Sequence, residues 1–264
     1  MSGRSTSLPG FGKAVRLEYA KMRRLRTSLV LGAVLLATIL FGTMQLFDAD
    51  HRARINEPNT MHWEFLLLTG YSSTKALFMP LLAAVLASRQ VDIEHHGNGW
   101  LRASMFGVTP GRLCTVKLLA LTPLVVLSTV VEMSVLVLAS RAAGATTPLP
   151  WVQWLWYGAV VVIVTLGVVG LHLWLAARVE SQLVGLGVGV LGGFLGFFSM
   201  LMPPWFAHLT PWGYLAAGLP YQLSPTGDAP LIAIPLPWGS MALFCCVMLG
   251  VLALARVRLD RVEI

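Results

Sequence analysis

Charged residues are scarce in this chain. Of its 264 residues, 12% are Asp, Glu, Lys or Arg, whereas 56% are hydrophobic. A water-soluble domain of this length cannot hide so many apolar side chains in one core. The composition therefore excludes an ordinary soluble globular protein and predicts that lipid forms part of the surroundings of this chain.

Cysteines are few, and catalytic motifs are missing. The three cysteines are Cys114, Cys245 and Cys246, and the last two are adjacent, so on a helix their side chains point about 100° apart. The sequence contains no HExxH and no GxSxG motif. Its nearest approach to a phosphate-binding loop, residues 10–14, lacks the Ser or Thr that should follow the lysine. We therefore expect no disulfide framework, catalytic residue, metal or cofactor in this chain.

Long apolar runs, by contrast, are abundant. A helix needs about 20 apolar residues to cross the hydrocarbon layer of a bilayer. Six stretches have this character, at residues 28–47, 65–88, 118–139, 155–177, 183–202 and 239–255. They predict an all-α polytopic membrane protein, formed as a single transmembrane domain over residues 1–264, with both ends of the chain on the same side of the membrane.

The distribution of Lys and Arg orients these six spans. Fifteen of the 19 basic residues fall in segments on the side of the termini, three fall on the opposite side, and Lys75 lies within a span. Because Lys and Arg are enriched in cytoplasmic loops, both termini are predicted to be cytoplasmic. The net charge of +7 then follows from membrane topology and does not indicate nucleic-acid binding.

Two charged residues lie inside the predicted spans. With a rise of about 1.5 Å per residue, Lys75 and Glu132 lie at matching depths, about 20 Å from the cytoplasmic ends of two consecutive antiparallel helices. A lone charge in lipid is unfavourable by about 3 kcal/mol or more, so the two residues are predicted to form an ion pair. A structural tie between the second and third spans is favoured over a role in substrate or proton handling.

Glycines and prolines mark two further segments. In the fifth span, Gly185, Gly189 and Gly193 recur at a spacing that lets two helix backbones approach closely. Packing within one chain and packing between two copies fit this pattern equally well. Residues 203–237 contain eight of the 15 prolines together with several Trp and Tyr. They predict either re-entrant or interfacial helices on the outer face, or an ordinary interfacial loop.

Residues 89–117 form the longest polar segment on the predicted cytoplasmic side. The sequence Gly-Asn-Gly at 97–99 ends the extension of the second span, and Asn98 is a favourable N-cap for a short helix that reaches Phe106. Thr109 and Pro110 then form a typical start for the helix of the third span. The segment therefore predicts a short transverse helix hung between two spans.

Such a short helix cannot bury much of its own surface. We expect Trp100, Met105 and Phe106 to be exposed, which favours a partner groove, or contact with lipid headgroups. Residues 13–27 predict another amphipathic helix, with Lys and Arg along it and apolar side chains between them. A basic helix of this kind is typical of the membrane surface, where its cations meet anionic lipids.

Together these features resemble the ABC-2 type transporter permeases. The resemblance is carried by the six spans, the basic N-terminal helix, the proline-rich outer segment and the inner patterns Asp92-x-Glu94, Asn98-x-Trp100, Pro110-x-Arg112 and Lys117. It is closest to the lantibiotic immunity and bacitracin-type export permeases. The resemblance covers nearly the whole chain.

This resemblance implies the membrane subunit of an ATP-driven exporter in the bacterial plasma membrane. The short inner helix would be a coupling helix that docks on a separate ABC ATPase, which binds and hydrolyses ATP with Mg. A second permease subunit, identical or related, would complete the transporter, and its substrate would be a peptide antibiotic, drug or other amphipathic compound. The residues implied are Asn98, Trp100, Leu101, Met105 and Phe106 for docking, with Glu94 and Arg112 at a cytoplasmic gate.

Two other classes of function fit parts of the pattern. One is an ATP-independent secondary transporter in which Lys75 and Glu132 relay protons, although the sequence shows no inverted repeat of the kind found in such proteins. The other is a membrane sensor or assembly factor that transports nothing. Only the short transverse helix predicted within residues 89–117, which is shaped for docking, argues against this class.

Overall fold

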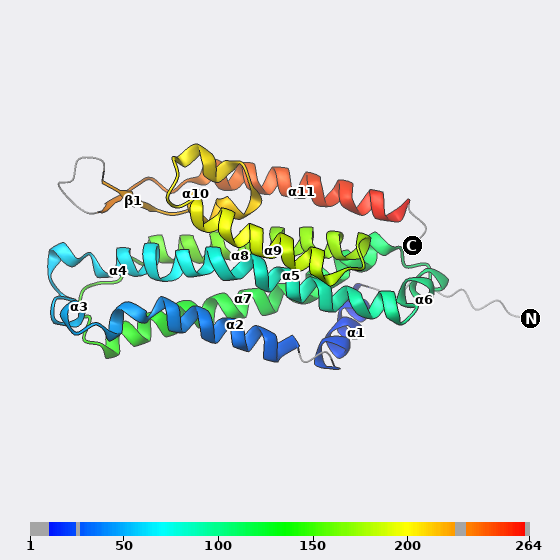
Figure 1. The fold of residues 1–264 in the computed structure, drawn as a ribbon, viewed down its shortest axis with the longest axis horizontal. Helices are drawn as coiled ribbons and strands as arrows, with labels where there is room; N and C mark the ends of the chain where they lie inside the picture. The colour runs from blue at the N-terminus through cyan, green and yellow to red at the C-terminus, as the bar shows by residue number, and fades with distance from the viewer. Residues whose placement is uncertain (1–10, 25–26, 225–230, 262–264) are drawn as a thin grey trace, which may run out of the picture.

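The long helices of the chain run side by side along one axis (Figure 1). The structure is a computed structural model, and it describes residues 11–24, 27–224 and 231–261. The long helices are α2 (Thr27–Gly42), α5 (Ser73–His96), α7 (Pro110–Ala142), α8 (Trp151–Arg178), α9 (Gln182–Phe198) and α11 (Trp238–Asp260). Consecutive long helices alternate in direction (Figure 1).

Four helical stretches in the described part of the chain are long and apolar enough to cross a bilayer. They are Pro110–Ala142, Trp151–Arg178, Trp238–Asp260 and His62–His96, which joins α4 (His62–Phe65), the π-helical segment η3 (Leu66–Ser72) and α5. A fifth candidate consists of α1 (Phe11–Arg24) and α2 if the two are counted as one span with a bend of 75°. These helices confirm a helical multi-pass membrane protein.

The first and fifth predicted spans form shorter helices than the sequence indicates. α2 has 16 residues and continues as the 3-10 helix η1 (Met44–Phe47), while α9 has 17 residues. The Oγ of Ser199 donates a hydrogen bond to the Leu195 carbonyl oxygen at the end of α9. Pro203 and Pro204 follow, and because proline lacks a backbone N–H, the helix cannot continue through them.

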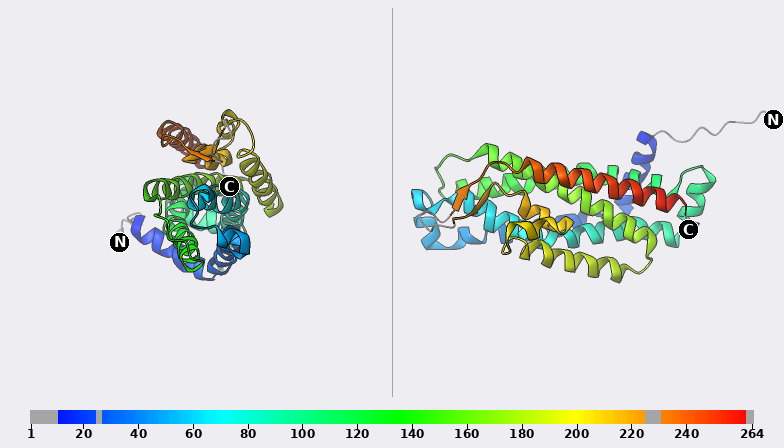
Figure 2. Two further views of the ribbon diagram at one scale, coloured as in Figure 1. Left: turned by 90° about the vertical axis from the view of Figure 1, so that its left-hand side faces the viewer. Right: turned by 90° about the horizontal axis from the view of Figure 1, so that it is seen from above.

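The two ends of the bundle carry different elements. One end, called the α6 end below, carries α1, α6 (Gly99–Met105) and the last turn of α11 (Figure 1). The opposite end carries α4, the short α3 (Ala49–Ala53) and a two-stranded hairpin. α1 lies across the bundle axis in all views (Figure 2), in agreement with its bend relative to α2. α1 and α6, which lie far apart in the sequence, are therefore found at the same end of the bundle.

α5 is the central helix of the bundle and packs on α2, α8 and α9. A Cβ atom added at Gly193 of α9 would lie 2.5 Å from the Leu77 carbonyl oxygen, and one at Gly189 would lie 2.8 Å from the Cβ of Ala84. At Gly185 such an atom would meet no described atom within 4 Å. Gly189 and Gly193 thus serve close packing within one chain, whereas Gly185 takes no part in this contact.

The proline-rich segment folds back beside α8 and α9. It forms η4 (Pro204–His208), η5 (Pro211–Gly213) and α10 (Tyr214–Ala217), set back from the end of the bundle (Figure 1). Trp156 and Tyr157 of α8 donate side-chain hydrogen bonds to the carbonyl oxygens of Gly218 and Leu215. These bonds hold the segment against α8.

The prediction of an all-α fold was wrong at one place. β1 (Tyr221–Leu223) and β2 (Leu231–Ala233) pair antiparallel, with Tyr221 opposite Ala233. Strands of three residues are too short to show a period-two pattern of apolar residues, so the sequence gives no signal for them.

Candidate functional site

The short helix α6 lies between α5 and α7 at the α6 end. Asn98 precedes it in the left-handed region with φ of 50°, and its side chain makes no capping hydrogen bond. The Oγ1 of Thr109 accepts a hydrogen bond from the backbone N–H of Arg112 at 3.3 Å, and Pro110 occupies the first position of α7. Asn98 therefore reverses the chain by its backbone conformation, while Thr109 is the residue that caps a helix through its side chain.

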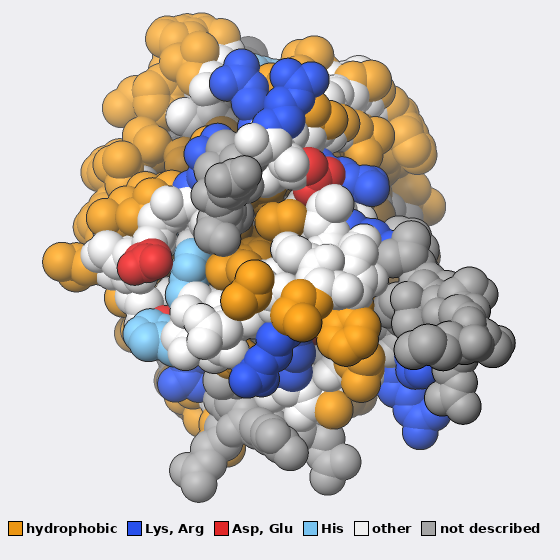
Figure 3. Space-filling model, turned by 90° about the vertical axis from the view of Figure 1, so that its right-hand side faces the viewer, with side chains coloured by type: hydrophobic (Ala, Val, Ile, Leu, Met, Phe, Trp, Pro, Cys, Tyr) orange, Lys and Arg blue, Asp and Glu red, His pale blue; other side chains and the backbone are white. Residues whose placement is uncertain are grey.

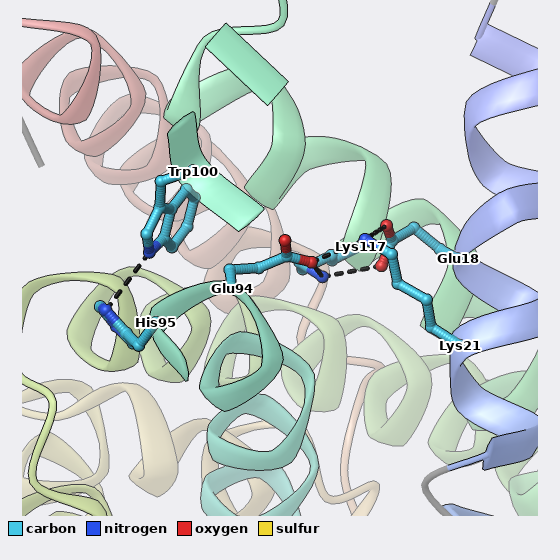
Figure 4. A network of polar contacts seen from close by, with 6 residues as sticks. All are labelled: Glu18, Lys21, Glu94, His95, Trp100 and Lys117. Carbon is cyan, nitrogen blue, oxygen red and sulfur yellow. Dashed lines mark hydrogen bonds and ion pairs between the residues drawn. The ribbon is translucent and has the colours of Figure 1, made fainter. Parts of the chain in front are cut away.

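α6 has one buried and one exposed side. Leu101, Met105 and Phe106 are 63%, 78% and 68% exposed. Trp100 is only 6% exposed, so the expectation that it faces outward was wrong. Its indole Nε1 donates a hydrogen bond to Nδ1 of His95 at 3.2 Å, and the two rings meet edge to face (Figure 4). Trp100 therefore anchors α6 to α5, and the apolar surface available to a partner comes from the other three residues.

Beneath α6 lies a group of four charged residues, called the acid–base cluster here: Glu18, Lys21, Glu94 and Lys117 (Figure 4). The Nζ of Lys117 lies 2.7 Å from Oε2 of Glu18 and 2.7 Å from Oε1 of Glu94. The Nζ of Lys21 lies 2.7 Å from Oε1 of each of the two carboxylates. The four contacts close a ring that joins α1, α5 and α7.

The charges of the acid–base cluster balance. Two carboxylates meet two ammonium groups, and the side chains of Glu18, Glu94 and Lys117 are at most 3% exposed. Burial acts to lower the pKa of Lys21, but its hydrogen bonds and charge interactions with Glu18 and Glu94 outweigh burial and raise that pKa above 10.5. Removing one member of a buried ion pair leaves an uncompensated charge, which is strongly unfavourable. The cluster therefore holds α1 against the bundle as long as all four members are present.

α6 rests directly on this cluster. A Cβ atom added at Gly99, the first residue of α6, would lie 2.8 Å from the Cα of Glu94 and would collide with the Glu94 carboxylate. Glycine at this position lets the start of α6 approach the cluster closely. A movement of α6 relative to the bundle must therefore act on Glu94.

Two further contacts connect the region of α6 to the remaining long helices. The Nε2 of His95 lies 3.0 Å from the carbonyl oxygen of Ala176 in α8. The backbone N–H of Gly111, in the first turn of α7, donates a hydrogen bond to Oδ1 of Asp260 at 2.8 Å. Asp260 is the last residue of α11, and its negative charge suits the N-terminus of α7. α8 and α11 are thereby joined to the segment that contains α6.

The other sequence-predicted charges lie elsewhere. In the middle of the bundle, Nζ of Lys75 lies 2.5 Å from Oε2 of Glu132, and the hydroxyl of Tyr71 donates to the same oxygen at 3.1 Å. All three side chains are buried. Arg112, expected beside Glu94 at a gate, is half-buried in the first turn of α7. In the ion pairs described above, the partners of Glu94 are Lys21 and Lys117.

Sequence reasoning missed Glu18, Lys21 and Lys117 as site residues. The spacing of Glu18 and Lys21 could have indicated an ion pair, because residues three apart share one face of a helix. Among the described residues, no group of three or more His, Cys, Asp or Glu side chains could hold a metal ion.

The fold and this site define a multi-pass helical membrane protein in which a short helix displays apolar side chains at one end and is tied to the long helices beneath it. A family model described as "ABC-2 family transporter protein" matches residues 14–196, which include most of α1 and all of α6 and the acid–base cluster. The chain belongs to this family and is an ABC-2 type permease, the membrane component of an ABC transporter rather than its catalytic component. Membership implies an ABC ATPase and the lipid bilayer as partners. Searches of curated proteins and of solved structures find no significant match.

Proposed function

We propose that this chain is the membrane-spanning subunit of an ATP-driven exporter in the bacterial plasma membrane. The observation that carries the proposal is the exposed apolar side of α6, formed by Leu101, Met105 and Phe106. Figure 3 shows hydrophobic side chains near the middle of the α6 end, with Lys and Arg side chains around them. An apolar patch with a charged rim is typical of a protein-binding surface. The partner proposed for it is the ATPase, on which ATP and Mg are bound.

The proposed topology has six spans, with both termini in the cytoplasm. α2 and α9 supply the two spans beyond the four long ones, because they lie along the same axis (Figure 1) and expose apolar side chains such as Leu36 and Phe194 that suit lipid. Trp151 and Trp238, which begin α8 and α11 at the opposite end, are exposed and suit the outer membrane interface. The whole chain, residues 1–264, forms a single transmembrane domain.

The proposed position of α1 is the inner membrane surface. Lys13, Arg16 and Leu17 lie on its exposed side, whereas Glu18 and Met22 are buried against the bundle. A helix that exposes basic and apolar side chains together suits the headgroup layer, where the cations meet anionic lipids. The acid–base cluster then connects a helix in the membrane surface to the docking helix.

In the proposed mechanism, the ATPases push α6 when they bind and hydrolyse ATP. α6 passes this movement to α5, because Gly99 rests on Glu94 and Trp100 is hydrogen-bonded to His95. Lys117 carries it to α7, since it is ion-paired with Glu94. Glu94 and Arg112 would thereby open or close the inner end of the transport path. We assign the Lys75–Glu132 pair the role of a structural tie that keeps α5 and α7 together during this movement, which its full burial supports.

Two features of the proposal rest on the resemblance alone. The substrate is proposed to be a peptide antibiotic, drug or other amphipathic compound that leaves the cell or the membrane, as for the lantibiotic immunity and bacitracin-type permeases. The second permease subunit is proposed to be either a copy of this chain or a related one.

Co-purification with the ATPase tests the docking surface. The double variant Met105→Ser/Phe106→Ser should lose both the bound ATPase and the stimulation of ATP hydrolysis by the permease, because it removes most of the exposed apolar surface of α6. A matched control exists at the opposite end, where Met44 and Phe47 are 65% and 73% exposed. Met44→Ser/Phe47→Ser should bind the ATPase normally. If the α6 variant binds and stimulates the ATPase as the unmodified chain does, docking through α6 is refuted.

A further inference from the structure

A groove lies between α7, α8 and α11, in the part of the bundle nearest the α6 end. Part of its empty volume is open to the surroundings. It has room for about four water-sized groups, because their centres can occupy about 50 Å³ and one such group needs about 10–15 Å³. None of its described lining residues belongs to α6 or to the acid–base cluster, so the groove is a separate feature of this end.

The deeper part of the groove is apolar. Leu252 lies one turn deeper in the bundle than Arg256, about 6 Å along α11, and Leu118 lies about 10 Å deeper than Gly111 along α7. The hydroxyl of Thr115, which also lines the groove, already donates a hydrogen bond to the carbonyl oxygen of Gly111. The deeper part therefore suits a hydrocarbon chain.

The mouth of the groove carries a positive charge. Arg256 is exposed, and its stem packs on the start of α7, since a Cβ atom added at Gly111 would lie 2.7 Å from its Cγ. A long basic side chain with a packed stem leaves its charged head to the surroundings. Among the described residues Arg256 forms no ion pair, and Asp260, one turn further on, instead accepts a hydrogen bond from the backbone N–H of Gly111. An anion can therefore bind to Arg256.

The position of Arg256 along α11 matches the depth of lipid phosphate. Arg256 lies about 27 Å along the helix axis from Trp238, the exposed first residue of α11. The hydrocarbon layer of a bilayer is about 30 Å thick. With Trp238 at one edge of this layer, Arg256 lies at the other edge, where the phosphate groups of that leaflet are found.

We propose that the groove binds one phospholipid of the leaflet at the α6 end. The guanidinium of Arg256 donates hydrogen bonds to the phosphate oxygens, and part of one acyl chain lies against Leu118, Trp174 and Leu252. A free phosphate would leave the apolar wall uncovered, and a hydrocarbon chain alone would leave Arg256 without an anion. The bound lipid ties α11 to α7 and α8. This inference goes beyond the proposed function, because it needs neither the ATPase nor a transported substrate.

Native mass spectrometry of the permease, purified in detergent and freed of lipid, tests the proposal. The probe is dioleoylphosphatidylglycerol, and two compounds separate its parts: dioleoylglycerol lacks the phosphate, and glycerol 3-phosphate lacks the chains. The first molecule of the phospholipid should bind severalfold more tightly than either. Binding of dioleoylglycerol as tight as that of the phospholipid would overturn the proposal, and so would equally tight binding of glycerol 3-phosphate.

Two arginines of α11 form a matched pair of variants. Arg256→Gln should weaken binding of the first phospholipid severalfold. Arg258→Gln should change it little, because Arg258 is also exposed but points to another side of the helix and does not line the groove. Unchanged binding to Arg256→Gln, or an equal loss in the two variants, would overturn the proposal.

A second pair of variants tests the apolar wall. Leu118→Trp fills the groove and should weaken binding, whereas Leu119→Trp, at a position that is 47% exposed and outside the groove, should not. Melting temperatures separate binding from folding, because a ligand stabilises only the protein that binds it. Without lipid, Arg256→Gln should melt as the unmodified chain does, and the phospholipid should stabilise it less. Equal stabilisation of the two proteins would contradict a site at Arg256. Because these assays contain no ATPase, their failure leaves docking through α6 intact.

Discussion

Among the described residues, charge is buried in two places, and the two places differ in how many elements they join. In the middle, Lys75 and Glu132 connect α5 to α7, with Tyr71 as a third partner. At the α6 end, the acid–base cluster connects α1, α5 and α7, and α6 rests on it through Gly99. One site is a pair between two helices, and the other is a meeting point of four.

This difference bears on movement. A single acid and a single base have one way to pair, so the Lys75–Glu132 contact is either made or broken. Two acids and two bases can exchange partners and keep every charge compensated. Lys21 is also 34% exposed in its side chain, so water can replace one of its contacts. The middle of the bundle is therefore suited to permanent attachment, and the α6 end is suited to rearrangement.

The largest effect is expected in the middle. Lys75→Met leaves Glu132 charged and buried without a cation, so the variant should lose about 3–5 kcal/mol of stability. Thermal unfolding in detergent, followed by the monodisperse fraction on gel filtration, measures this loss. The double variant Lys75→Met/Glu132→Leu removes both charges and should recover most of it.

A double variant as unstable as the single one would show that the ion pair itself is not what holds α5 to α7. A stable Lys75→Met protein that binds its ATPase and transports nothing would move the pair from structure to substrate handling. Either result would remove the contrast with the α6 end.

The second effect concerns the acid–base cluster. Glu94→Gln keeps the size of the side chain but removes one of two negative charges, so we expect a loss of stability of about 1–3 kcal/mol and a large loss of ATPase stimulation. The stability loss is smaller than in the middle because Glu18 still compensates Lys117. Glu57→Gln, at an exposed position of the opposite end, is the control and should change neither quantity. Glu94→Gln with full ATPase stimulation would show that the cluster does not take part in coupling.

The sequence was sufficient to predict features that depend on the depth of a residue in the membrane or on the residues that begin and end a helix. Lys75 and Glu132 were paired from their positions along two neighbouring helices, and the structure places them in contact. The limits of α6 followed from the Gly-Asn-Gly turn and from Thr109-Pro110. Membership of the ABC-2 family was also expected from the order of these elements, and the family model confirms it.

Contacts that depend on how helices distant in the sequence cross one another could not be predicted from the sequence. α1 bends by 75° from α2, and only this bend brings Glu18 and Lys21 to Glu94. Trp100 was expected outside because a helix of two turns has no pattern long enough to identify its buried side. Its indole is buried because His95, five residues earlier on α5, offers an acceptor nitrogen. Contacts of this kind need the three-dimensional path of the chain.

Three glycines extend the comparison to the packing of the backbone. A methyl group at Gly193 would meet the backbone of Leu77, which cannot move aside, so Gly193→Ala should lower stability by about 1–3 kcal/mol. Gly185→Ala in the same helix should not, because that site is open. Gly99→Ala would push against Glu94 and should reduce ATPase stimulation more than stability. The ratio of lost ATPase stimulation to lost stability should therefore be higher for Gly99→Ala than for Gly193→Ala. Equal ratios would show that the α6 end has no greater part in coupling than the middle of the bundle.

The smallest effect is the loss, at alkaline pH, of the stability that Lys21 contributes at the α6 end. Since the pKa of Lys21 is raised above 10.5 in the folded protein, its contribution to stability is complete below that pH and is lost as the pH rises through the higher, folded value. The melting temperature of the unmodified chain minus that of Lys21→Gln should therefore be constant near neutral pH and should shrink above about pH 10.5. The subtraction is needed because other lysines also lose their protons in this range. A difference that stays constant through strongly alkaline pH would mean that Lys21 contributes through its packing, and that the charge exchange proposed for the cluster depends on Lys117 alone.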